Sequence, residues 1–269
     1  MRSTRPKPLH RLCGRAMVLY VLDSLAEVHV DRAVVVVGHG ADQVTKHLVE
    51  DGLDLPLEFV EQSVQRGTAD AVMVGLTGLP DDDGLDDVDD GGDVLVLPGD
   101  TPLLQAGTIS ALLARHQESG AACTVLTTLP ADATGYGRVL RDAAGNATGV
   151  REHKDASAGE RAIREWNTGV YSIDLAFLRR ALPLLSASNA QNEIYLTDLV
   201  SMAAAEGGAA TLAWAAEDVG GVNDRAQLAD LERVMRRRIA TRLAQSGVTV
   251  RCLDTAYVDA TVTVEPDAT

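Results

Sequence analysis

The sequence predicts an α/β protein in which helices cover both faces of a doubly wound sheet. Three short apolar runs, over 33–37, 94–97 and 123–129, are each followed by glycine or proline. The first two are rich in valine and apolar at every position, which is typical of parallel strands buried on both faces. Between the runs, apolar residues recur at helical spacing over 16–26 and 108–116. Alternation of strand and helix favours a sheet of this kind.

The composition is that of a globular protein with one large domain and an appendage. The chain has 269 residues, of which 46% are hydrophobic and 23% charged, so it can bury a sizeable core. Its formal net charge of −15 opposes attraction to nucleic acid and to anionic lipid. No apolar run approaches the roughly 20 residues of a membrane-spanning helix, and 1–15 lacks the apolar core of a signal peptide. We therefore expect a cytoplasmic protein that binds neither nucleic acid nor membrane.

The cysteines and an acidic tract narrow the class of protein further. Cys13, Cys123 and Cys252 are widely separated and form no CxxC pair, so they indicate neither a zinc site nor a disulfide framework and fit a reducing compartment.

Eight aspartates gather in the tract over 81–93. The tract has almost nothing to bury, so we interpret it as a solvated loop insertion, with a cation site as the alternative.

A long amphipathic helix is predicted from Asp224 to about Gln245. Its aliphatic residues recur at steps of three and four, whereas its arginines are spread over the other faces. These arginines indicate a solvated or docking face in preference to a phosphate or nucleic-acid patch. After Gly247 the sequence becomes β-like, with two six-residue units that begin at Val258 and Val264. Such a period is typical of a β-helix, but two units are too few to form a stable domain.

A carboxylate after the second apolar run is the first candidate site residue. Asp100 follows Pro98 and Gly99, and ligands in open α/β sheets bind outside the carboxyl ends of the strands. The Asp100 carboxylate can bind Mg²⁺ while substrate phosphates complete the coordination shell, and Gly99 allows close approach of the backbone. The alternative is that Asp100 is a turn residue or caps the helix near Thr108.

Two further clusters have the chemistry of a nucleotide or sugar pocket. Gly67 and Thr68 precede small residues, so their N–H groups and hydroxyl can bind an anion or a base edge, although an ordinary N-cap explains Thr68 equally well. Farther along, glycines flank Tyr136, Glu152 lies in a charged loop, and Asn167 precedes a Thr-Gly turn. Sugar hydroxyls need such fixed donors and acceptors, although turn chemistry explains each piece alone.

Together, and in this order, the clusters resemble the uridylyltransferase half of a bacterial bifunctional family, the N-acetylglucosamine-1-phosphate uridylyltransferase/glucosamine-1-phosphate acetyltransferases. The resemblance covers essentially the whole chain. The segments that carry it are Met1-Arg2-Ser3, Pro6-Lys7-Pro8-Leu9-His10, Gly38-His39-Gly40, Gln65-Arg66-Gly67-Thr68-Ala69, Pro98-Gly99-Asp100-Thr101-Pro102, Gly135-Tyr136-Gly137-Arg138, Glu152-His153-Lys154-Asp155, Asn167-Thr168-Gly169, Asn192-Glu193-Ile194-Tyr195-Leu196-Thr197-Asp198, Gly221-Val222-Asn223-Asp224-Arg225 and Tyr257-Val258-Asp259-Ala260.

The resemblance implies an Mg²⁺-dependent nucleotidyltransferase. Members join UTP and N-acetylglucosamine 1-phosphate, which yields UDP-N-acetylglucosamine for peptidoglycan and cell-envelope synthesis and releases pyrophosphate. The implied fold is a Rossmann-like domain with a mixed, mostly parallel sheet over 1–224, a linker helix over 225–247 and the start of a left-handed β-helix acetyltransferase domain over 248–269. The alternatives are another sugar-phosphate nucleotidyltransferase and a non-catalytic fragment that binds a UDP-sugar.

The resemblance also implies a role for individual residues. Asp100 and Asn223 would bind the Mg²⁺, and Lys7 would neutralise phosphate charge as a second catalytic residue beside Asp100; the alternative for Lys7 is an ordinary exposed lysine. Gln62, Gly67 and Thr68 would face the uridine, and Gly137, Glu152 and Asn167 would hold the sugar. The same substrate-binding set includes Gln65, Gly99, Tyr136 and Asn223.

Two departures from the family pattern bear on activity. The family opens with a strand and a Gly-rich loop of the form Leu-x-x-Gly-x-Gly-Thr-Arg-Met, whereas this sequence begins at what resembles the final methionine. We expect the domain to lack this strand and its phosphate-binding loop, which predicts very low transferase activity and marginal stability. We also expect the acetyltransferase activity, and the homotrimer that the family forms through its β-helix, to be lost.

Overall fold

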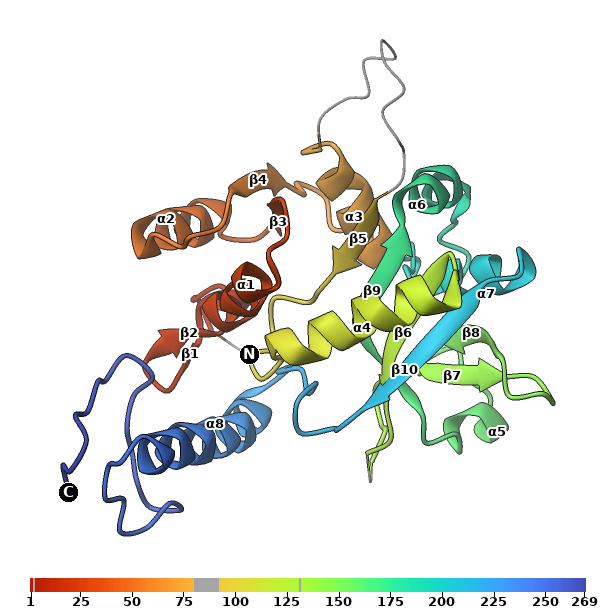
Figure 1. Ribbon diagram of the computed structural model, residues 1–269. Helices are drawn as coiled ribbons and strands as arrows, with labels where there is room; N and C mark the ends of the chain where they lie inside the picture. The colour runs from red at the N-terminus through yellow and green to blue at the C-terminus, as the bar shows by residue number, and fades with distance from the viewer. Residues whose placement is uncertain (2, 80–91, 131) are drawn as a thin grey trace.

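The structure, a computed structural model, describes residues 1, 3–79, 92–130 and 132–269. Its helices are α1 (Met17–Val28), α2 (Ala41–Asp51), α3 (Thr68–Leu76), α4 (Ala106–Ser119), α5 (Ala158–Arg161), α6 (Leu175–Ala181), α7 (Asp198–Ala205) and α8 (Arg225–Gln245), with 3-10 turns at Lys7–Leu9 and Leu182–Leu184. Its strands are β1 (Arg11–Leu12), β2 (Arg15–Ala16), β3 (Ala33–Val37), β4 (Leu57–Glu61), β5 (Asp93–Val96), β6 (Cys123–Thr128), β7 (Arg138–Arg141), β8 (Ala147–Arg151), β9 (Trp166–Asp174) and β10 (Ala209–Trp214). Figure 1 shows their arrangement, and the predicted α/β class is confirmed.

The largest sheet is mixed. It has the order β10-β6-β9-β7-β8, and β5 also pairs with β9. β10 is parallel to β6, whereas β9 is antiparallel to β5, β6 and β7, and β7 is antiparallel to β8. The expectation of mostly parallel pairing is therefore wrong for the described strands. For β7 and β8 the physical reason is the tight turn over 142–146, where Asp142 accepts hydrogen bonds from the N–H groups of Ala144 and Asn146, because a hairpin fixes its strands antiparallel.

The predicted apolar runs and helices are present. The first run forms β3 over its whole length, the second forms β5 one residue early, and the third forms β6. The helical patterns form α1, α4 and α8. At the start of α8 the Asp224 carboxylate accepts hydrogen bonds from the N–H groups of Ala226 and Gln227, and Gly120, with φ of +60°, ends α4. The acidic tract lies outside the described residues except for Asp93, which begins β5 and contacts the ring of His116 at 3.2 Å.

The three apolar strands are not equally buried. β6 is buried at all six positions, whereas the three central valines of β3 are half-buried and β5 has no fully buried residue. The prediction that the first two runs are buried on both faces is thus wrong. Each of these strands has a described partner on one edge only, because β3 pairs with β4 and β5 pairs with β9.

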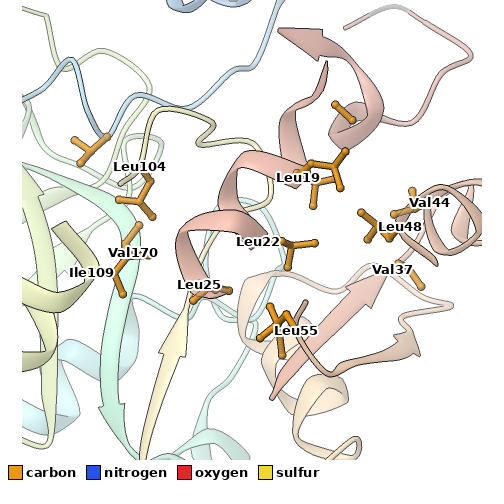
Figure 2. Close-up of a cluster of buried hydrophobic side chains, with 14 of the residues drawn as sticks. Leu19, Leu22, Leu25, Val37, Val44, Leu48, Leu55, Leu104, Ile109 and Val170 are labelled. Carbon is orange, nitrogen blue, oxygen red and sulfur yellow. The ribbon is translucent and has the colours of Figure 1, made fainter. Parts of the chain in front are cut away.

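Helix α1 joins the β3–β4 pair to the rest of the molecule. Its leucines Leu19, Leu22 and Leu25 belong to one buried apolar cluster that includes Val37 and Leu48 from β3 and α2. The same cluster continues through Leu104, Ile109 and Val170 toward the main sheet. Figure 2 shows α1 between these two groups of side chains. The core therefore runs across both sheets through one helix.

The segment after α8 lies against that helix and β1. Residues 248–269 contain turns and, as described, no strand, so the expected start of a β-helix is not confirmed. The Ala260 N–H donates to the Cys13 carbonyl oxygen at 2.9 Å, and Val258 packs against the cluster that includes Leu12 and Ile239. Two six-residue units cannot stack on each other, so their apolar side chains pack on the helix instead.

The arginines of α8 form a docking face, one of the two predicted alternatives. Arg238 donates to the Leu103 carbonyl oxygen at 2.8 Å and pairs with Asp218, and the Arg236 guanidinium lies 3.9 Å from the centroid of the Tyr257 ring. That α8 links two domains stays a prediction. No helix within the described ranges is long and apolar enough to cross a membrane.

Replacing Ile109 with alanine tests the shared core. Ile109 is fully buried between α4 and the main sheet, so Ile109→Ala leaves a cavity and should lower the free energy of unfolding by about 2–5 kcal/mol. The free energy of unfolding is measured by urea denaturation, with circular dichroism as the signal. The control, Val49→Ala, changes a side chain that is 65% exposed on α2 and should shift stability by less than about 0.5 kcal/mol. Equal losses in both variants would contradict a core that passes through Ile109.

Candidate active site

Three predicted residues from distant parts of the chain meet beyond the carboxyl end of β5. Lys7 lies in the first 3-10 turn, where Pro6 and Pro8 flank it and favour that conformation. Its ammonium pairs with the Asp100 carboxylate and donates to Asn223 Oδ1 at 3.1 Å. The Val222 N–H donates to the Asp100 carbonyl oxygen at 3.0 Å, which fixes Asn223 beside Asp100. Lys7 is thus a paired lysine and not an isolated surface cation.

This arrangement has the donor set of a hard divalent cation. A carboxylate oxygen of Asp100 and the amide oxygen of Asn223 already surround one positive group, the Lys7 ammonium. Mg²⁺ in phosphate-binding enzymes commonly takes one or two protein oxygens and completes its shell with substrate phosphate and water. Within the described ranges no group of three His, Cys, Asp or Glu side chains could hold a metal ion. Asp100 and Asn223 are thus the two predicted metal ligands, and the structure brings them together around the Lys7 ammonium.

Most of the predicted residues line a single cavity of about 1350 Å³. Asp100, Asn223 and Gly67 do not line it. Tyr136 lies on the wall of this cavity. Burial, together with the nearby carboxylates of Asp100 and Asp224, raises the pKa of its hydroxyl. Its ring also contacts Trp166 edge to face. The predicted residues that line the cavity are Lys7, Gln62, Gln65, Thr68, Gly99, Tyr136, Gly137, Glu152 and Asn167.

The loop between β4 and α3 is held rigidly. Gln62 Nε2 donates to Asp70 Oδ2 at 2.7 Å, so a buried carboxylate orients its amide group. Gly67 has φ of +119°, and a Cβ there would lie 2.5 Å from the Ile194 carbonyl oxygen. Only glycine fits this close approach. The N-cap interpretation of Thr68 is wrong, because Gly67 is the N-cap and the Thr68 hydroxyl accepts a hydrogen bond from Leu196 N–H at 3.0 Å.

The segment over 194–196 bonds to this loop at three places. The Ile194 N–H donates to the Arg66 carbonyl oxygen at 2.7 Å, and the Ile194 carbonyl oxygen accepts from Ala69 N–H at 3.0 Å. The Leu196 N–H to Thr68 contact is the third. The next residue, Thr197, donates its hydroxyl to Glu152 Oε1 at 3.1 Å. One short segment therefore contacts both the loop that carries Gln62 and the carboxylate on the opposite side of the cavity.

Asn167 and Glu152 form the other side of the cavity. The Asn167 N–H donates to the Gly137 carbonyl oxygen at 2.9 Å. Its side-chain Nδ2 donates to Tyr171 Oη at 2.6 Å, and its Oδ1 accepts from Gly169 N–H at 3.0 Å. Burial raises the pKa of Glu152, and the hydrogen bond from Thr197 opposes this rise only in part. Two oriented polar groups, an amide and a partly desolvated carboxyl, thus point at the same volume.

Three supporting residues were not predicted as part of the site. Asp70 orients Gln62, Tyr171 orients Asn167, and Thr197 donates to Glu152. Asp70 and Thr197 lie within or beside the motifs that carry the resemblance, so those motifs contained a signal for them. Tyr171 lies four residues beyond Asn167 in β9, and nothing in the local pattern distinguishes it from a core tyrosine.

Comparison with known proteins agrees with this geometry. Residues 1–166 match the family model described as the MobA-like NTP transferase domain, which is more than half of the chain. The chain belongs to the MobA-like NTP transferase family. Within this NTP transferase family, it resembles proteins named bifunctional protein GlmU over its whole length, which confirms the resemblance recognised from the motifs.

Three of these relatives illustrate the similarity. The NTP transferase chain is 47% identical to the bifunctional protein GlmU of Sorangium cellulosum over 274 residues, 100% of this chain and 55% of the relative. The corresponding protein of Streptomyces avermitilis is 43% identical over 271 residues, 100% of this chain and 54% of that protein. The bifunctional protein GlmU of Thermoanaerobacter pseudethanolicus is 38% identical over 268 residues, which are 99% of this chain and 56% of that protein. The chain thus spans about half the length of the curated relatives it matches.

The Lys7 ammonium should compete with a metal ion for Asp100. We expect Lys7→Met to bind Mn²⁺, a paramagnetic substitute for Mg²⁺, up to about fivefold more tightly in the absence of substrate, because a partly exposed ion pair contributes about 0.2–1 kcal/mol. Water proton relaxation measures the affinity. Asp100→Asn should lose most of the binding, since an amide is a weaker ligand than a carboxylate.

The matched control is Lys46→Met, which removes a lysine that pairs with Glu50 on α2. Mn²⁺ affinity should stay at the wild-type value in this variant. An unchanged affinity in Lys7→Met as well would contradict the competition between the ammonium and the cation.

Burial of Glu152 gives a pH dependence with a defined sign. Because the folded-state pKa is raised above the ordinary value of 4.5, the unfolded chain releases this proton first as pH rises. The free energy of unfolding therefore falls from about pH 4.5 upward until the folded-state pKa is passed. We expect Glu152→Gln to abolish this component, so that wild type loses stability relative to the variant as pH rises above about 4.5 in urea titrations.

Glu160 provides a control of opposite sign. The hydrogen bond from the Ser157 N–H lowers the pKa of its carboxyl, so its contribution to stability is lost as pH falls. Glu160→Gln should therefore approach wild-type stability at low pH. Parallel pH curves for wild type and Glu152→Gln would contradict the proposed desolvation of Glu152.

Proposed function

We propose that this chain catalyses uridylyl transfer from UTP to N-acetylglucosamine 1-phosphate, with Mg²⁺ as the cofactor. The observation that carries the proposal is the convergence of nine of the twelve candidate residues on one cavity, with Lys7 connecting it to Asp100 and Asn223. Membership of an NTP transferase family supports the class of reaction. The products would be pyrophosphate and UDP-N-acetylglucosamine, a precursor of peptidoglycan and the cell envelope, formed in the cytoplasm.

The reaction needs positioning and charge neutralisation more than proton transfer. A phosphate oxygen of the sugar phosphate attacks the α-phosphorus of UTP, and the bond from that phosphorus to the oxygen of the departing pyrophosphate breaks. The attacking oxygen is already ionised near neutral pH, so no general base is required. The Lys7 ammonium would neutralise part of the negative charge that gathers around the α-phosphate. Asp100 and Asn223 would hold Mg²⁺, which supplies further neutralisation and aligns the phosphates.

Specificity would come from the two polar sides of the cavity. On one side, Gln62, whose Nε2 donates to Asp70 and to the Gly67 carbonyl oxygen, would offer its amide oxygen as an acceptor to the edge of uracil. Gly67, Thr68 and Gln65 would complete the nucleotide side, and Gly99 would allow close approach beside Asp100. On the other side, Gly137, Glu152 and Asn167 would bind the sugar hydroxyls and acetamido group, with Tyr136 beside them. A site that hydrogen-bonds such groups rejects analogues that leave its own polar groups unpaired.

Pyrophosphate release tests this proposal. The chain is mixed with each of the four ribonucleoside triphosphates and with either N-acetylglucosamine 1-phosphate or glucose 1-phosphate, with Mg²⁺ or with a chelator. We expect release only with UTP, N-acetylglucosamine 1-phosphate and Mg²⁺, and near-complete loss in Asp100→Asn. Calorimetric binding of UDP-N-acetylglucosamine is measured in parallel.

Each other result identifies an alternative. A preference for a different base or sugar would indicate another sugar-phosphate nucleotidyltransferase. Binding of the nucleotide sugar without any turnover would indicate a binding fragment, and failure to bind it would refute the proposal.

Asn167→Ala separates the two substrates. The variant should raise the KM for N-acetylglucosamine 1-phosphate about 3- to 10-fold, the equivalent of one neutral hydrogen bond of about 0.5–1.5 kcal/mol, and leave the KM for UTP near its wild-type value. Tyr171→Phe should give a smaller change in the same direction, because Tyr171 only orients the amide. Equal rises in both KM values would show a general loss of structure and contradict the assignment.

A further inference from the structure

A buried carboxylate, Asp70, lies behind Gln62 in the wall of the cavity. Asp70 is in the first turn of α3 and is only 4% exposed. Its two oxygens face two different donors. Gln62 Nε2 donates to Oδ2 at 2.7 Å, and Arg66 Nε lies 3.3 Å from Oδ1. Both oxygens of this carboxylate therefore act as hydrogen-bond acceptors.

The amide group of Gln62 has one orientation that satisfies its neighbours. Besides Asp70, Nε2 donates to the Gly67 carbonyl oxygen at 3.4 Å. An ionised carboxylate and a carbonyl oxygen can only accept, so each takes one of the two amide hydrogens. Reversal of the amide would place its oxygen against two other oxygens and leave them unpaired, which is costly in a partly buried place. The group that Gln62 leaves free for a ligand is therefore Oε1, which is an acceptor only.

The backbone around this amide is fixed as well. The Gln62 N–H donates to the Val37 carbonyl oxygen at 2.7 Å, at the end of the paired strands β3 and β4. The Gly67 carbonyl oxygen accepts from Ala71 N–H at 3.2 Å in the first turn of α3, and Asp70 belongs to the same turn. Gln62 and its two acceptors are thus held by regular secondary structure, and the polarity of the amide cannot be reversed by a small shift of the loop.

We propose that Asp70 is a positioning residue that makes the site select uracil over cytosine. This inference rests on the proposed function and names the residue that sets its choice of base. Uracil carries a hydrogen at N3, whereas N3 of neutral cytosine is an acceptor. The fixed Oε1 of Gln62 accepts the uracil hydrogen, but opposite cytosine it faces a second acceptor, and both groups stay unpaired. Asp70 excludes the reversed amide, which would donate to cytosine.

Replacing Asp70 with asparagine tests the inference, because the two side chains have nearly the same shape. Asparagine can donate or accept, so Gln62 can take either orientation beside it. Calorimetry with Mg²⁺ gives the affinities for UTP and CTP, and their ratio cancels the change in protein charge because the two nucleotides carry the same charge. We expect wild type to bind UTP at least ~10-fold more tightly than CTP. In Asp70→Asn this ratio should fall about 3- to 10-fold, the equivalent of one neutral hydrogen bond.

The matched control is Asp23→Asn. Asp23 is a partly buried aspartate of α1 that pairs with Arg15 and does not line the cavity. Its replacement should leave the ratio of UTP to CTP affinity at the wild-type value. If Asp70 were only structural, Asp70→Asn would weaken both nucleotides equally and leave the ratio unchanged. That result would overturn this inference alone, because a wild-type preference for UTP would still support the proposed function.

Two measurements on the wild-type chain decide the matter even when Asp70→Asn fails to fold. By NMR, both hydrogens of the Gln62 side-chain amide should exchange with solvent at least ~10-fold more slowly than those of Gln43, which is exposed on α2. The 5′-triphosphate of 3-methyluridine, in which a methyl group replaces the N3 hydrogen, should bind at least ~10-fold more weakly than UTP.

The outcomes that contradict the inference differ from those that contradict the proposed function. Equal exchange at the two glutamines, equal affinity for UTP and its 3-methyl analogue, or a wild type that does not prefer UTP to CTP would each overturn the role of Asp70. Failure of the wild type to bind UTP, CTP and UDP-N-acetylglucosamine would overturn the proposed function, and this inference with it.

Discussion

The apolar face of α1 is the contact on which the geometry of this molecule depends. Among the described strands no ladder connects β3–β4 with the main sheet, so Leu22 and Leu25, packed in a common core, hold the two parts together. The loop that carries Gln62 follows β4, and Asp100 follows β5. Apolar packing of α1, together with that of α3 against the main sheet, therefore fixes the separation between the loop that carries Gln62 and Asp100. Such packing has no directional hydrogen bonds, but its close fit resists displacement.

Polar contacts then set the orientation of each functional group. Lys7, Asp100 and Asn223 come from the first turn, the end of β5 and the residue before the cap of α8, and they contact one another directly. Behind the cavity lining, Asp70 and Tyr171 each hold one amide side chain by a hydrogen bond. Groups that are held in this way lose little further freedom when a ligand binds, so the arrangement favours selectivity at low entropic cost.

The elements that follow from local patterns were predictable, and those that depend on distant partners were not. Valine runs and leucine spacing identified β3, β5, β6, α1, α4 and α8, because periodicity reports which face of an element is covered. The antiparallel β7–β8 hairpin was missed because its turn over 142–146 lies between two segments that were interpreted only as parts of a sugar pocket. The half-burial of Val35 could not be predicted, since it depends on whether a neighbouring strand is present. Motif order placed the candidate residues around one cavity, but Tyr171 has no sequence signal because its role is defined only by its bond to Asn167.

The segment over 194–197 makes the two sides of the cavity thermodynamically linked. Ile194 is bonded at both its N–H and its carbonyl group to the Gln62-bearing loop, and Thr197 is bonded to Glu152. Displacement of either side strains a shared backbone of four residues. If a ligand on one side changes the affinity of the other through this segment, linkage requires the factor to be the same in both directions. Heterotropic cooperativity between two small molecules can thus arise within one domain, without a subunit interface.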